Sequence, residues 1–164
     1  MMTANKIKQL ADSALKSHEK KDYEEAEEKF LEALYLLDDK ENELYQLIVY
    51  GLGLNYLKQS NFEGARRCFE EGRLNARKAE NISHELEMHH LLVVVYRQAG
   101  DIEAAKLLSE EEILYRKKHA PNDYEGLAVA YFEASKIYRK LGDTEKYEQV
   151  FKEALSNAQK VTDF

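Results

Sequence analysis

The stretch LGLNYLKQSNFEGARRCFEE, residues 52–71, decides the fold. Before a short polar break, Gly53 and Tyr56 lie about one helical turn apart; after it, Ala65 and Phe69 share one face. Small and apolar residues recur at spacings of three, four and seven, which is the periodicity of an α-helix. The stretch therefore predicts two helices joined by a tight turn, which is a helical hairpin.

Each second helix is expected to begin after a residue that caps it. The side-chain oxygen of Asn61 can accept one of the free N–H groups of the first helical turn. Pro121 ends the preceding helix because its ring would block continuation. The equivalent predicted caps are Asp22 with Glu25, Asp101, and Asp143 or Thr144, and Asn122 with Glu125 is predicted to cap the first helix of the fourth hairpin.

The hairpin occurs four times. The residues that open the second helices, Ala26, Ala65, Ala105 and Tyr147, lie 39, 40 and 42 positions apart. A single hairpin cannot bury its apolar faces alone, so copies are expected to stack. The sequence predicts an all-α, right-handed superhelical stack of eight helices forming one repeat domain over residues 1–164. The hairpins are expected at about 4–37, 42–79, 84–118 and 123–161.

The order small residue, Tyr, polar break, Ala, Phe, Ala resembles the tetratricopeptide repeat, and the resemblance covers essentially the whole chain. The usual period of that family is about 34 residues, so the repeats here, at about 40, are longer than usual. Longer repeats are similar to those of bacterial peptide-sensing regulators, including the Rap-type family, and of some eukaryotic scaffold proteins. The resemblance implies a concave groove that binds extended peptides or partner helices.

Composition excludes several classes of function. The chain of 164 residues carries a formal net charge of −7, which argues against a duplex nucleic-acid binder and against docking on an anionic membrane. Cys68 is the sole cysteine, which fits a reducing compartment. The first twenty residues lack the apolar core of a signal peptide or membrane span. We therefore expect a cytoplasmic protein with no nucleic-acid or membrane partner.

The face of each first helix that does not pack on its own partner helix is expected to line the groove. It is apolar in the middle hairpins and cationic toward the fourth, which predicts an apolar peptide or helix that carries an acidic group. The alternative is that some of these residues are buried between neighbouring hairpins. The predicted partner-binding residues are Leu47, Tyr50, Leu54, His90, Leu91, Val94, Arg97, Phe132, Lys136 and Arg139.

The final helix has no polar helix after it in the sequence. Repeat stacks usually end with a polar-faced element, whereas Leu155, Val161 and Phe164 remain apolar here. These three residues predict self-association, a partner that covers this end, or a chain that belongs to something longer.

The residues that could act in catalysis or metal binding do not form a recognisable site in the sequence. His84 and His89 lie five positions apart, about 140° around a helix, and cannot share one metal ion as an i, i+4 pair would. Arg66 and Arg67 could lower the pKa of the neighbouring Cys68 thiol, but a lone helical cysteine is more often a packing residue. No glycine spacing forms a phosphate-binding loop. We expect no catalytic residue, no metal and no cofactor.

Four positions depart from the repeat pattern. Ser109 and Glu112 stand where Phe and a small residue are expected, which predicts poorer apolar packing of that helix. Tyr147 replaces an alanine. Gly51 costs about 1 kcal/mol in a helix relative to alanine, so either a ligand or a neighbouring backbone lies close to it or the glycine is tolerated drift.

The most favoured function is a non-catalytic adaptor or scaffold that binds a segment of a partner protein in the groove. One alternative is a regulator that senses a short signalling peptide. Another is an export-type chaperone for an apolar client. The sequence names neither the partner nor the pathway.

Overall fold

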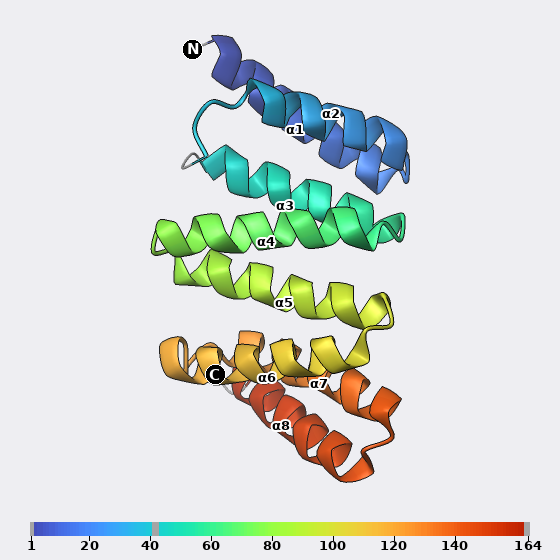
Figure 1. The fold of residues 1–164 in the computed structure, drawn as a ribbon. Helices are drawn as coiled ribbons and strands as arrows, with labels where there is room; N and C mark the ends of the chain where they lie inside the picture. Colours follow the sequence, from blue (N-terminus) through green and yellow to red (C-terminus); the bar gives the residue numbers. More distant parts are fainter. Residues whose placement is uncertain (1, 41–42, 163–164) are drawn as a thin grey trace. The chain divides into compact units, whose positions relative to one another are not determined.

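The computed structural model describes residues 2–40 and 43–162. These residues form eight α-helices and no strand, as the sequence predicts (Figure 1). Position 42, where the second hairpin is expected to start, and Phe164 lie outside the described residues. The helices are α1 (Met2–Glu19), α2 (Tyr23–Leu36), α3 (Glu43–Lys58), α4 (Phe62–Lys78), α5 (Ile82–Gln98), α6 (Ile102–His119), α7 (Tyr124–Leu141) and α8 (Thr144–Thr162).

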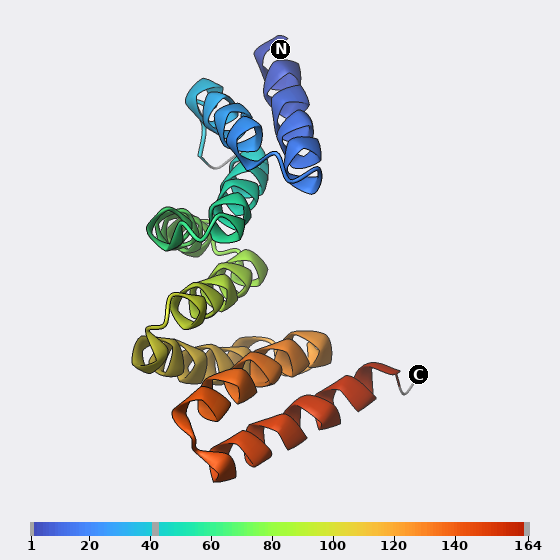
Figure 2. The ribbon, with the colours of Figure 1, turned by 90° about the vertical axis from the view of Figure 1, so that its right-hand side faces the viewer.

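The chain divides into two compact units. The first unit spans Met1–Met88 and the second spans His89–Phe164, so the division falls inside α5. In the first unit α1 packs on α2, α3 packs on α4, and α3 also contacts α2 and α1. In the second unit α7 packs on both α6 and α8. Figure 2 shows the antiparallel pairs within each unit.

One turn geometry recurs in all four hairpins. A residue with positive φ precedes the N-cap of each second helix: Lys21, Ser60, Gly100 and Gly142. The N–H of the cap then bonds a carbonyl five residues earlier, as from Asn61 to Tyr56 at 2.8 Å. The cap side chain accepts a backbone N–H three residues later, as the Asn61 Oδ1 does from Gly64 at 3.0 Å. The observed caps are Asp22, Asn61, Asp101 and Asp143, and they confirm the prediction at these turns.

The predicted cap at the start of α7 is wrong. Asp123, not Asn122, caps this helix, and its Oδ1 accepts the N–H of Gly126 at 3.0 Å. The N–H of Asp123 bonds the carbonyl of Ala120 at 3.1 Å. This turn after Pro121 places Asp123 at the N-cap, and α7 begins at Tyr124.

Two phenylalanine rings fix α3 in the first unit. A Cβ added to Gly51 would lie 2.6 Å from Cζ of Phe30, and one added to Gly53 would overlap the ring of Phe69. Phe30 and Phe69 are both fully buried. The close neighbour of Gly51 is therefore a side chain of the preceding hairpin. Gly53 serves the packing of α3 on its own partner, α4.

The second unit buries two smaller apolar clusters. Val93, Ala105 and Ile137 join α5, α6 and α7. A second cluster, formed by Leu127, Tyr131 and Ala154, joins α7 to α8. Beside it, Tyr147 stacks on Phe151 with ring centroids 5.7 Å apart, so the large residue at this position packs along its own helix.

A buried polar network joins α6 to α5 and to the start of α7. Glu112 is fully buried, and its carboxylate accepts hydrogen bonds from Nδ1 of His90 at 3.1 Å and from Nε of Arg116 at 2.8 Å. Nη1 of Arg116 also lies 3.5 Å from the Asp123 carboxylate. Burial raises the pKa of Glu112, but the hydrogen bonds and charges of His90 and Arg116 outweigh it and hold that pKa below its ordinary value. Polar contacts thus replace the apolar packing of the other second helices.

The Gly51→Ala substitution tests the contact with Phe30. Alanine favours a helix by about 1 kcal/mol over glycine, yet we expect a net loss of about 1–3 kcal/mol in the free energy of unfolding, because the buried ring must move. Urea unfolding of Gly51→Ala, Phe30→Leu and the double variant measures this. The double variant should lose less than the sum of the single losses. A neutral or stabilising Gly51→Ala would contradict the packing described.

The Glu112→Gln substitution tests the buried network. Removing one partner of a buried ion pair should lower the free energy of unfolding by about 3 kcal/mol at pH 7. Because the folded-state pKa of Glu112 is depressed, its contribution is present above the ordinary value of 4.5 and is lost as the pH falls below it. The difference between wild type and variant should therefore shrink in acid. Exposed Glu111→Gln is the control, and a difference independent of pH would rule out the ionic role.

Candidate functional site

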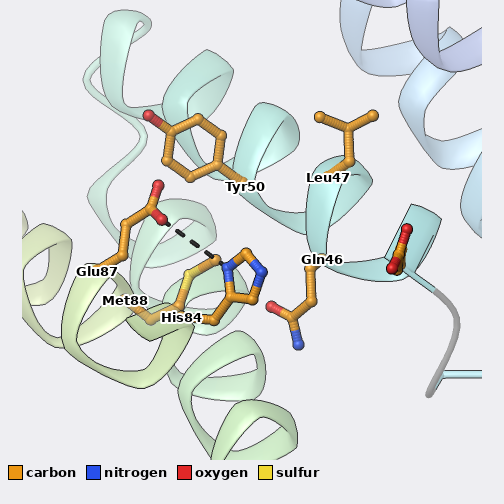
Figure 3. Close-up of a pocket in the computed structure, with 7 residues that line it drawn as sticks. Gln46, Leu47, Tyr50, His84, Glu87 and Met88 are labelled. Carbon is orange, nitrogen blue, oxygen red and sulfur yellow. Dashed lines mark ion pairs between the residues drawn. The ribbon is translucent and has the colours of Figure 1, made fainter. Parts of the chain in front are cut away.

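The first unit carries a surface hollow between α3 and α5, here called the α3/α5 hollow. Its cavity volume is about 260 Å³. Leu47, Tyr50 and Met88 supply apolar walls, and Figure 3 shows their side chains around the opening. Leu47 is 38% exposed although it is a large aliphatic residue. The lining residues are Glu43, Gln46, Leu47, Tyr50, His84, Glu87 and Met88.

Polar groups in this hollow are mainly hydrogen-bond acceptors. Oε1 of Gln46 is buried and is without a hydrogen-bond partner among the described residues. Nδ1 of His84 lies 3.8 Å from Oε2 of Glu87, the ion pair drawn in Figure 3. Burial, and then the charge of Glu87, raise the pKa of Tyr50, so its phenol remains a neutral donor. The hollow suits an apolar side chain next to a donor or a cation.

The second unit carries a hollow between α7 and α8, here called the α7/α8 seat. Its cavity volume is about 350 Å³. Phe132 is 48% exposed and Leu155 is 59% exposed at its edge, and the rings of Phe132 and Phe151 lie 6.4 Å apart. Nζ of Lys136 lies 4.9 Å above the Phe132 ring. The lining residues are Ala128, Val129, Phe132, Glu133, Lys136, Phe151, Ala154, Leu155 and Ala158.

The predicted partner-binding residues fall into several environments. Leu47 and Tyr50 meet in the α3/α5 hollow, and Phe132 and Lys136 meet in the α7/α8 seat. Arg97 and Lys136 both pair with buried Glu133, the latter at 3.5 Å, and His90 pairs with buried Glu112. The remaining predicted residues are half-buried Leu54, Leu91 and Val94, and exposed Arg139, Leu155 and Val161.

Sequence reasoning did not assign Glu43, Gln46, His84, Glu87 or Met88 to the α3/α5 hollow. A signal for one of them exists in the repeat register. Glu87 lies 14 residues before the cap Asp101, as Leu47 does before Asn61. Aligning the hairpins on their caps would have assigned Glu87 to the same face. Met88 has no such signal, because its place depends on how α5 packs against Gly72.

The histidines and the cysteine that were considered for metal binding or catalysis make other contacts in the structure. Nε2 of His89 donates to the carbonyl of Leu108 at 2.9 Å, whereas His84 and His90 pair with different glutamates. In the described ranges no three His, Cys, Asp or Glu side chains gather as a metal site would require. Burial, and then Glu71, raise the pKa of Cys68 to about 12, so its thiol stays protonated. No helix of the described chain is long and apolar enough to cross a membrane.

The tetratricopeptide-repeat family model matches residues 128–160, which lie in α7 and α8. No curated protein matches the chain. Among solved structures, the chain is similar to BtubC (BKLC) from P. vanneervenii, with 16% identity and a TM-score of 0.84 over 96% of this chain and 65% of that one. It is also similar to aspartyl phosphate phosphatase F from Bacillus subtilis, with 15% identity and a TM-score of 0.85 over 97% of this chain and 42% of that one.

The chain thus spans less than two thirds of the length of these two proteins. It also resembles the nearly identical TPR-like repeats of a kinesin light chain from Podosopora anserina, with 11% identity, a TM-score of 0.50 and coverage of 96% and 97%. Identities this low show the fold alone. The family match in the fourth hairpin and the shared fold thus show helical hairpins of the tetratricopeptide-repeat type.

Proposed function

We propose that this protein is a non-catalytic interaction module that holds a peptide or helix of a partner protein in the α3/α5 hollow. The tetratricopeptide-repeat fold is that of a protein-interaction scaffold. The partner would insert one apolar side chain between Leu47, Tyr50 and Met88. A cavity of about 260 Å³ fits one such anchor with its flanking backbone.

The unsatisfied Gln46 side chain is the observation that carries this proposal. A buried acceptor without a partner costs about 1–3 kcal/mol, and Oε1 of Gln46 has no hydrogen-bond partner among the described residues. Rotation of the Gln46 side chain toward the opening would let a bound segment donate a backbone or side-chain N–H to this oxygen and remove the cost. The apolar walls beside it supply the remaining driving force for binding, since a bound segment would remove the apolar surface of Leu47 and Tyr50 from water.

The charge at the rim limits the partner's chemistry. Glu43 and Glu87 line the hollow, and His84 is paired with Glu87. Carboxylates at the edge of an apolar pocket favour a cationic residue next to the apolar anchor. We therefore assign to this hollow a segment in which a large apolar residue stands near a lysine or arginine.

A non-catalytic role agrees with the state of Cys68. A thiol with a pKa of about 12 is not a nucleophile near neutral pH. The cations beside it are also occupied: Arg66 pairs with Glu63 and Glu70. The arginines therefore do not activate this cysteine.

A regulator that senses a short peptide is the second candidate. The observation that favours it is the repeat spacing of about 40 residues, which resembles that of bacterial peptide-sensing regulators. The minimal length of the bound segment separates the two functions. Calorimetric titration of nested truncations of an identified partner would favour the regulator if fewer than about ten residues retain full affinity.

Tyr50→Ala is expected to abolish capture of the partner. Tyrosine side chains in partly desolvated pockets often dominate binding, and their loss costs about 2 kcal/mol or more, about thirtyfold in affinity. Pull-down from the source cells with quantitative mass spectrometry measures the change. Leu47→Arg should act in the same direction, because it places a cation at the proposed cationic edge of the ligand.

Tyr35→Ala is the matched control, because Tyr35 is 87% exposed and lies on α2 outside the hollow. Circular dichroism should show the same helix content for all variants. If every protein captured by the wild type is captured equally by Tyr50→Ala and Leu47→Arg, the α3/α5 hollow is not the binding surface.

A further inference from the structure

In each hairpin, four equivalent residues of the second helix face the next helix that packs on that hairpin. These positions lie 8, 11, 12 and 15 residues after the N-cap, and together they are here called the docking face. In the first hairpin they are Phe30, Ala33, Leu34 and Leu37; in the third, Ser109, Glu112, Ile113 and Arg116; in the fourth, Phe151, Ala154, Leu155 and Ala158.

In the first unit, α3 covers the docking face of the first hairpin. Ile48 and Leu52 of α3 share one buried cluster with Phe30 and Ala33. Leu44 packs against the same cluster. Gly51 lets the helix approach the Phe30 ring. The helix that fits this face therefore carries large aliphatic residues at i, i+4 and i+8 and glycine at i+7.

In the second unit, α7 lies beside the polar docking face of the third hairpin, and its own sequence is different. The residues of α7 that correspond to those four α3 positions are Gly126, Ala130, Glu133 and Ala134. Gly126 leaves room for the guanidinium of Arg116, which also pairs with Asp123 at the start of α7. The apolar docking face thus packs against a helix with aliphatic side chains, and the polar docking face packs against a helix with small and polar side chains.

The docking face of the fourth hairpin forms the α8 wall of the α7/α8 seat, and it is open. It matches the first hairpin at three of its four positions, with Phe, Ala and Leu in the same order. Whereas Phe30 is fully buried under α3, Leu155 is 59% exposed and Val129 and Phe132 are each 48% exposed. The match on α8 favours an α3-like helix in this seat, whereas on α7 the larger Phe132 and Lys136 stand at the positions of Ala11 and Leu15 in α1.

The neighbouring first helix adds a charge requirement. In the first hairpin, Nδ1 of His18 lies 2.9 Å from Oδ1 of Asn55, which stands at i+11 of α3. The residue of α7 that corresponds to His18 is Arg139, an exposed cation. An acidic residue at i+11 of the bound helix would therefore pair with Arg139.

A second copy stacked head to tail does not meet this pattern. Its α1 would have to occupy the seat as the first helix of the next hairpin. At the four required positions α1 carries Asn5, Gln9, Asp12 and Ser13, which are polar. Placing them on an apolar face would bury polar groups without partners.

We propose that the α7/α8 seat binds an amphipathic helix of a partner protein, with aliphatic residues at i, i+4 and i+8, glycine at i+7 and an acidic residue at i+11. This surface is separate from the α3/α5 hollow, and its occupancy does not depend on the function proposed for that hollow.

A designed peptide tests the pattern. It keeps Leu44, Ile48, Gly51 and Leu52 of α3, has aspartate in place of Asn55, and has alanine, glutamate and lysine elsewhere. A lactam bridge on the solvent face holds it helical, because a free helix of this length is marginal in water. Fluorescence anisotropy with the full chain gives the dissociation constant.

Binding to the wild type is expected, and Leu155→Lys should weaken it about tenfold or more, because it places a charge against the apolar stripe. Phe132→Ala should also weaken it. Leu114→Lys is the matched control, because Leu114 is 69% exposed on α6, outside the seat. Arg139→Glu should weaken the aspartate peptide more than the peptide that retains asparagine.

Two control measurements show which surface the peptide occupies and how closely it approaches. A peptide with valine in place of Gly51 should bind more weakly if the helix approaches Phe151 as α3 approaches Phe30. Tyr50→Ala should leave peptide binding unchanged, so failure of the α3/α5 hollow and failure of the seat are distinguishable.

Equal affinity of the wild type and Leu155→Lys, or no binding at up to about 1 mM peptide, would overturn the proposal. So would a dimer in sedimentation that Leu155→Lys abolishes and that the peptide does not displace. That last result would assign the seat to a second copy, which is one of the three alternatives that the apolar end of the sequence leaves open.

Discussion

The clamping of α3 between two phenylalanine rings is the constraint on which the packing of the first unit depends. Phe30 of the preceding hairpin meets α3 at Gly51, and Phe69 of its own hairpin meets it at Gly53. Both rings are fully buried, so neither can swing aside to admit a methyl group. Two glycines in one helix would weaken it in isolation. Here they let α3 approach both neighbours closely.

The hairpins were predictable because their determinants are local. The spacing of apolar residues and the caps Asp22, Asn61 and Asp101 act within one or two turns, and the structure has the helices where these signals place them. The N-cap of α7 was assigned to the wrong residue for a similarly local reason. Pro121 is followed by two capable caps, Asn122 and Asp123, and the choice between them depends on the turn closed by the carbonyl of Ala120.

The candidate site was only partly predictable because its walls come from different hairpins. Leu47 and Tyr50 followed from the helical period of α3. Met88 did not, since its place depends on how α5 packs against Gly72, and the unsatisfied Oε1 of Gln46 did not, since hydrogen-bond partners depend on contacts between helices. The prediction for the cationic residues was incomplete for the same reason. Helical spacing placed Arg97 and Lys136 on an open face, but it did not show that both pair with the buried Glu133.

The turns between the helices bear unequally on stability. In the first unit the positive-φ position is held by Lys21, Ser60 and Glu80, whereas in the second unit it is held by Gly100 and Gly142. A side chain in this backbone region costs about 1–2 kcal/mol, which glycine does not incur. Glycine at these three positions of the first unit, which lie outside both hollows, is therefore expected to raise the free energy of unfolding. A more heat-resistant form of this scaffold is accessible there without alteration of either surface that a partner would touch.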